Sequence, residues 1–153
     1  MTAHQELIRI KIAHLERMAS YLAWSLEQVR TFVPILDWAS LSQEQHESLA
    51  AFRVRFSDFQ EHIGKTMRAV AIEEEENHEP FGAVLAFMEK LGILDSTQHW
   101  KTLRELRNAI NHEYEDRPER LAEFFRLLVE ETPTLLGYAS RLADFCKQYR
   151  EVQ

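Results

Sequence analysis

The sequence predicts an all-α protein, an antiparallel bundle of four to five main helices that forms a single domain over residues 1–153. Only four glycines and four prolines occur in 153 residues, and helix-forming residues predominate throughout. Apolar residues recur at intervals of three, four or seven positions over long stretches. A chain of this length buries about two-thirds of its unfolded surface, which is enough for one hydrophobic core.

Two long helices are expected in the first half of the chain. The first runs from about residue 3 to about 33, where Pro34 ends it. The second opens at Ser42-Gln-Glu-Gln45, which has the pattern of a capping box. Each carries one apolar stripe, comprising Ile8, Ile12, Leu15, Leu22, Leu26, Val29 and Val33 in the first and Leu49, Phe52, Phe56, Phe59, Ile63, Met67 and Val70 in the second.

Shorter helices are expected in the second half. A third helix begins near Pro80 and ends at Gly92, which suits a left-handed cap. Asp95 or Ser96 caps a helix over about 96–114, and Pro118 opens the next one. Pro133 is expected to break or kink that helix and so to separate a last helical piece.

The acidic run from Glu73 to Glu79 includes His78, a combination that raises the question of a metal site. Carboxylates at the end of a helix oppose its dipole, so we expect a frayed, solvated loop instead. No metal and no cofactor are predicted for the chain.

The composition indicates a soluble, cytoplasmic protein without membrane contact. The single Cys146 cannot form an internal disulfide, and no signal peptide or membrane-spanning stretch is apparent. A net charge of −7 disfavours a free-standing nucleic-acid binder. Near residue 107 five cations are matched by as many acids: Lys101, Arg104, Arg107, Arg117 and Arg120 against Glu105, Glu113, Glu115, Asp116 and Glu119.

The candidate catalytic residues lie in a stretch that contains Arg107, His112 and Tyr114, in the pattern Arg-x4-His-x-Tyr. Arginine forks onto phosphate oxygens, and histidine exchanges protons near neutral pH, so the two could cleave RNA without metal. On a straight helix Arg107 and His112 lie about 140° apart, whereas Arg107, Asn111 and Tyr114 lie within about 60° of one another. Either termination of the helix near Glu115-Asp116 or a second subunit must bring the groups together, and a two-fold dimer is the simpler solution.

This motif resembles that of HEPN-domain proteins, specifically the toxins of HepT/MntA (MNT–HEPN) toxin–antitoxin pairs. The resemblance extends from about Phe52 to Phe145, and the first 50 residues match only in being helical. It includes the order of three segments, Pro80-Phe81-Gly82-Ala83-Val84-Leu85, Met88-Glu-Lys-Leu-Gly-Ile-Leu94 and Leu103-Arg-Glu-Leu-Arg-Asn108.

The resemblance implies a homodimeric, metal-independent ribonuclease with Arg107 and His112 as catalytic residues. Asn108 and Asn111 are supporting polar residues in this interpretation. Tyr114 matches the tyrosine that a cognate MNT-type nucleotidyltransferase, the antitoxin, modifies with AMP to silence the toxin. The implied substrate is RNA, either tRNA or mRNA.

Two other interpretations stay open. The chain could be a non-catalytic helical subunit that binds a small nucleotidyltransferase or its nucleotide, which suits the net charge of −7. It could also be a helical bundle with a vestigial motif, since carboxylates of Glu113, Glu115 and Asp116 surround His112 and would repel RNA phosphates.

Overall fold

The computed structural model describes residues 1–109 and 117–150, and every described regular element is helical. This confirms the predicted all-α bundle. The elements are α1 (Ala3–Arg30), α2 (Gln43–Glu73), α3 (Phe81–Lys90), α4 (Thr97–Asn108) and α5 (Pro118–Cys146), with short 3-10 helices η1 (Trp38–Ser40) and η2 (Lys147–Arg150).

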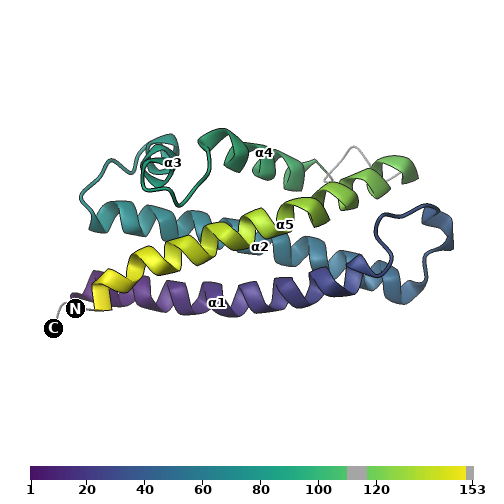
Figure 1. The fold of residues 1–153 in the computed structure, drawn as a ribbon, viewed down its shortest axis with the longest axis horizontal. Coiled ribbons are helices and arrows are strands. Elements are labelled where there is room, and N and C mark those ends of the chain that lie inside the picture. Colours follow the sequence, from purple (N-terminus) through teal and green to yellow (C-terminus); the bar gives the residue numbers. More distant parts are fainter. Residues whose placement is uncertain (110–116, 151–153) are drawn as a thin grey trace.

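Helix α2 is the centre of the bundle, because it packs against α1, α3, α4 and α5. Figure 1 shows α1 and α2 as a long antiparallel hairpin, with α3 and α4 along the opposite side of α2. Helix α5 returns past α2 and α4 and ends beside the start of α1. Three long helices therefore form the body, and α3 and α4 cover one flank of it.

The core follows the predicted stripes closely. The aromatic rings of Phe52, Phe56 and Phe59 on α2 are fully buried. They belong to one buried cluster with apolar residues of α1 and α5 that include Ile12, Leu22, Leu128 and Leu142. Burial of such side chains contributes about 1.5–3 kcal/mol each, so the apolar stripe of α2 contributes substantially to the stability of the bundle.

Most of the predicted helix boundaries are confirmed by their caps. Ser42 and Gln45 form the reciprocal hydrogen bonds of a capping box at the start of α2. Pro80 is the N-cap of α3, and Gly92, with φ of 76°, follows its end in the left-handed region. Ser96 rather than Asp95 caps α4, through a hydrogen bond from the His99 N–H to its hydroxyl.

Pro133 does not end the helix, so the prediction of a break and of a separate last helical piece was wrong. Helix α5 continues through it from Pro118 to Cys146. Proline removes one backbone hydrogen bond, but Leu128, Thr132 and Leu135 are fully buried on both sides of it. Ending the helix there would expose this face, so tertiary packing outweighs the local cost.

The acidic run was predicted to be a frayed loop, and this is only partly correct. Helix α2 does end at Glu73, but the Glu73 carboxylate accepts a hydrogen bond from Gln5 and contacts the His4 ring at 2.9 Å. The Glu74 carboxylate accepts one from the Tyr149 hydroxyl. These two glutamates thus join α2 to α1 and η2, while Glu75 and Glu76 are in the loop.

None of the described helices is long and apolar enough to cross a membrane. Within the same residues, no group of three or more histidine, cysteine or acidic side chains is arranged to hold a metal ion.

Candidate functional site

Helix α4 carries the first half of the predicted motif. Trp100 and Leu103 are buried against the bundle, and Leu106 packs partly against the core. Arg107 follows Leu103 by four residues, which places it at the flank of the same buried face. The residue is half-buried, in keeping with a position at the edge of that face.

The motif helix is shorter than predicted. Helix α4 ends at Asn108, and Ala109 forms its C-cap, whereas the sequence predicted a helix to about residue 114. The angle of about 140° between Arg107 and His112 assumed a straight helix through both residues. Because α4 ends before His112, which lies outside the described residues, the angle does not apply to this pair and neither supports nor excludes a dimer.

The Arg107 guanidinium is anchored to the central helix. Its Nη1 donates a hydrogen bond of 2.8 Å to the backbone carbonyl of Ser57 on α2. Burial lowers the pKa of Arg107, opposed by the nearby carboxylates of Glu61 and Asp58, and Arg104 lowers it further. Arginine stays charged despite such a shift, so a fixed positive charge lies at this point.

Arg107 lines a hollow of about 190 Å³ between α2, α3 and α4, which we call the Arg107 hollow. The residues that line it are Gln60, Glu61, Gly64, Lys65, Arg68, Phe81, Trp100, Arg104 and Arg107. Four of these side chains are cationic and one is a carboxylate. Among the described residues, the lining of this hollow is thus positive on a protein whose net charge is −7.

The floor of the Arg107 hollow is buried and only partly hydrogen-bonded. Gln60 and Trp100 are 1% and 2% exposed. The Gln60 Nε2 donates to the Trp100 carbonyl at 3.4 Å. Three buried atoms, Gln60 Oε1, Trp100 Nε1 and Arg107 Nε, have no hydrogen-bond partner among the described residues. Such groups are costly to bury unpaired, and they cluster where a ligand or water completes them.

Two cations at the rim of the hollow, Arg68 and Lys65, make different contacts. The Arg68 guanidinium lies 5.0 Å from the centre of the Phe81 ring, in a cation–π contact. The Lys65 ammonium lies 3.5 Å from the Glu61 carboxylate, and both side chains are more than half exposed. An exposed pair of this kind contributes little to stability, so Lys65 is available to an incoming anion.

The remaining predicted site residues divide into two groups. Asn108 is exposed at the last position of α4. Asn111, His112 and Tyr114 lie outside the described residues, so the structure does not bring them together with Arg107 or separate them from it.

Sequence reasoning missed the residues that α2 contributes, Gln60, Lys65 and Arg68. The stripe of α2 was interpreted as core, and the polar positions between its phenylalanines were not assigned a role. One signal was present: Gly64 interrupts a long run of good helix formers, and a glycine inside a helix costs about 1 kcal/mol relative to alanine. Phe81 and Trp100 lie next to this glycine, at ordinary contact distance from the place of a Cβ.

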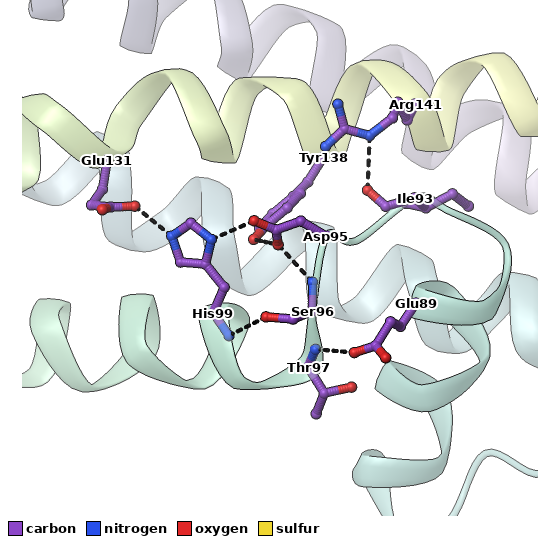
Figure 2. A network of polar contacts seen from close by, with 9 residues as sticks. All are labelled: Glu89, Ile93, Asp95, Ser96, Thr97, His99, Glu131, Tyr138 and Arg141. Atoms are coloured by element: carbon purple, nitrogen blue, oxygen red, sulfur yellow. Dashed lines mark hydrogen bonds and ion pairs between the residues drawn. The ribbon is translucent and has the colours of Figure 1, made fainter.

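A polar network on the other side of α4 fixes this helix against α5 (Figure 2). His99 lies between two carboxylates, with Nδ1 2.5 Å from Asp95 and Nε2 2.7 Å from Glu131. The Tyr138 hydroxyl donates to the second oxygen of Asp95 at 2.6 Å, and the Ser96 N–H donates to that same oxygen. The network therefore ties the start of α4 to the middle of α5.

The charges in this network stabilise one another. Burial disfavours protonated His99, but the hydrogen bonds to Asp95 and Glu131 outweigh it and raise the His99 pKa above its ordinary value of 6.5. Burial also opposes the charge on Asp95, yet hydrogen bonds from Tyr138, His99 and the Ser96 N–H lower its pKa.

The His99 network predicts a specific dependence of stability on pH. Because the folded-state pKa of His99 is raised, its contribution is complete below about pH 6.5 and is lost as the pH rises through the higher folded value. We expect His99→Gln to cost about 1 kcal/mol more at pH 5.5 than at pH 8.5. Urea unfolding at both pH values measures this, with His78→Gln as the matched control. An equal cost at both values would contradict the account.

Comparisons with protein-family models, with curated proteins and with solved structures find no match for this chain. The resemblance to HEPN toxins therefore rests on the Arg107-x4-His112-x-Tyr114 pattern and on the order of the segments around it. Family membership stays a prediction, and the Arg107 hollow is the structural observation that bears on function.

Proposed function

We propose that this protein is a metal-independent endoribonuclease, the toxin of a HepT/MntA-type toxin–antitoxin pair. The observation that supports this most is the position of Arg107, anchored at Ser57 in a hollow lined by three further cations. A phosphodiester needs such a concentration of positive charge, since phosphate contacts dominate the affinity for nucleic acids. The net charge of −7 weighs against RNA binding in general, but the charge around Arg107 favours it locally.

The proposed reaction uses the ribose itself as the nucleophile. The 2′-oxygen attacks the adjacent phosphorus, its proton passes to a base, and the bond from phosphorus to the 5′-oxygen breaks. The leaving oxygen takes up a proton, and the products are a 2′,3′-cyclic phosphate and a 5′-hydroxyl. His112 is assigned one of the two proton transfers, and Arg107 the stabilisation of negative charge on the phosphate oxygens.

Regulation follows from the same resemblance. A cognate nucleotidyltransferase attaches AMP to Tyr114, which adds negative charge seven residues after Arg107 in the sequence. An anion that reaches the Arg107 guanidinium occupies the place of the substrate phosphate, so modification silences cleavage. The homodimer is part of the proposal through the resemblance alone.

The alternative proposal is a non-catalytic subunit that binds a small nucleotidyltransferase or its nucleotide. The overall acidity of the chain favours it, because a subunit of that kind does not have to attract RNA. A positive hollow beside Arg107 serves the phosphates of a nucleotide as well as those of RNA. Only a measurement of cleavage separates the two proposals.

Incubation of purified, unmodified protein with total RNA in excess EDTA tests the proposed activity. We expect cleavage at an unchanged rate with and without the chelator, and no cleavage by His112→Ala. A circular dichroism spectrum of His112→Ala controls for folding. Cleavage that stops in EDTA, or that His112→Ala retains in full, would refute the metal-independent mechanism.

A further inference from the structure

We infer that the Arg107 hollow is a nucleotide subsite, which holds one nucleotide of single-stranded RNA with its base on the Phe81–Trp100 side and its phosphate at the cationic rim. The inference rests on the proposed function, because Arg107 belongs to both. It goes further in assigning to α2 and α3 the task of positioning the substrate and in naming the chemistry that is recognised.

The rim accounts for the phosphate. Lys65, Arg104 and Arg107 come from two helices, α2 and α4, and border the same hollow. Lys65 and Arg104 are exposed, so an anion reaches them without displacing protein. Guanidinium groups bind phosphate through charge-assisted hydrogen bonds, which are stronger than neutral ones. Of the described residues that line the hollow, Glu61 alone is a carboxylate, and it opposes the binding of any anion.

The floor accounts for the base. Half-buried Phe81 supplies aromatic surface at the floor, on which bases stack without strong sequence preference, and Trp100 is buried beneath it. The unpaired atoms at this floor, which are closed to solvent, are of both kinds, an acceptor in Gln60 Oε1 and donors in Trp100 Nε1 and Arg107 Nε. A phosphate offers acceptors only, whereas a nucleobase edge offers donors and acceptors together. The mixed polarity therefore favours a base over a second phosphate.

The size of the hollow limits what enters it. At about 190 Å³ it is smaller than the roughly 300–1,000 Å³ of pockets that enclose a drug-sized ligand. One nucleotide can project into it while the rest of the strand remains outside. Double-stranded RNA keeps its bases stacked and paired, so it does not present a free base to the hollow.

The Trp100 indole is a direct reporter of this subsite. We would record its Nε1–H resonance by NMR during titration with AMP, UMP, adenosine and inorganic phosphate in turn. The two monophosphates are expected to shift the Trp100 signal saturably and more strongly than adenosine or phosphate. Trp24, exposed on α1, and Trp38, in η1, are internal controls whose signals should stay in place.

Two substitutions, one that removes a positive charge and one that removes a negative charge, test the contribution of the rim to nucleotide binding. Arg104→Gln is expected to weaken AMP binding about tenfold, because it removes a charged donor. Glu61→Gln is expected to tighten it about threefold, because it removes the opposing carboxylate. Arg17→Gln, on the exposed surface of α1, is the matched control and should leave binding unchanged.

Gly64→Ala separates loss of the subsite from loss of folding. A Cβ at this position lies 3.5 Å from Phe81 Cζ and 3.6 Å from Trp100 Cζ2, which is ordinary contact, so the methyl group fits. Alanine also favours the helix over glycine. We therefore expect a higher Tm together with AMP binding weakened at least about fivefold, because the methyl group narrows the floor.

A trinucleotide with 2′-O-methyl riboses, which lacks the nucleophile and is not cut, distinguishes RNA from a free nucleotide. It is expected to bind more tightly than AMP, since its flanking phosphates add contacts with the rim. Tighter binding of AMP than of the trinucleotide would overturn the assignment to RNA.

The remaining outcomes are equally decisive. If no ligand shifts the Trp100 Nε1–H resonance, or if inorganic phosphate shifts it as strongly as AMP does, the assignment of a nucleotide subsite is overturned. If RNA is cleaved in EDTA but nucleotides do not shift the Trp100 resonance, the subsite is overturned and the ribonuclease proposal is left intact. Nucleotide binding without any cleavage removes the ribonuclease proposal and leaves the subsite intact.

Discussion

Replacement of Arg107 by alanine is expected to lower the rate of RNA cleavage by about a hundred- to a thousandfold, the usual effect of removing one group that stabilises developing negative charge. The guanidinium is the cation of the hollow that the structure anchors through a backbone carbonyl, that of Ser57. Such anchoring fixes the charge in place before substrate arrives, which is what makes electrostatic stabilisation effective. Initial rates on total RNA in EDTA measure the effect.

Arg107→Lys and thermal unfolding are the controls for this prediction. Lysine keeps the charge but lacks the planar fork, so cleavage should fall to an intermediate level. The Tm of Arg107→Ala should stay within a few degrees of the parent, because the residue is only half-buried and its one described hydrogen bond is to Ser57. A folded Arg107→Ala that cleaves at the parent rate would rule out the assigned role.

Phe56→Ala is expected to lower the free energy of unfolding by about 3–5 kcal/mol, the largest effect on stability that we predict. The ring is fully buried on α2, the helix that contacts each of the other four α-helices. Its removal leaves a cavity that the long antiparallel helices cannot close without moving together. Urea unfolding measured by circular dichroism determines the loss.

Val54→Ala is the matched control, two residues away on the same helix. Its side chain is half exposed, so the substitution should change the free energy of unfolding by less than about 0.5 kcal/mol. A cost for Phe56→Ala below about 1 kcal/mol would show that α2 is not the packing centre of the bundle.

The fold was predictable because its helices carry regular apolar stripes and begin at residues that form N-caps. The stripe from Leu49 to Val70 on α2 is buried throughout, and the capping box at Ser42 forms as expected. These features depend on neighbours within one turn or on the helical period, both of which are visible in a single sequence.

The errors in helix boundaries arose where tertiary contacts outweigh local preference. Pro133 disfavours a helix locally, but the buried residues around it keep α5 continuous. The glutamates at the end of α2 oppose the helix dipole, yet contacts of Glu73 with α1 and of Glu74 with Tyr149 hold them in place. Those partners lie about seventy residues away in the chain, so no local rule indicates them.

The candidate site was predictable only in part, for the same reason. Arg107 stands out by its motif. The hollow itself is formed by side chains from α2, α3 and α4, and Gln60, Arg68 and Phe81 carry no shared pattern in the sequence. Their role becomes visible only when the fold brings the three helices together.

The chemical nature of the cleaved ends tests the central claim most directly. RNA cut by the purified protein in excess EDTA should carry a 2′,3′-cyclic phosphate on one fragment and a 5′-hydroxyl on the other, as expected when the 2′-oxygen attacks and Arg107 stabilises the phosphate. Mass spectrometry of a short defined RNA identifies both ends. Fragments with a 3′-hydroxyl and a 5′-phosphate, produced only when divalent metal is present, would contradict the account.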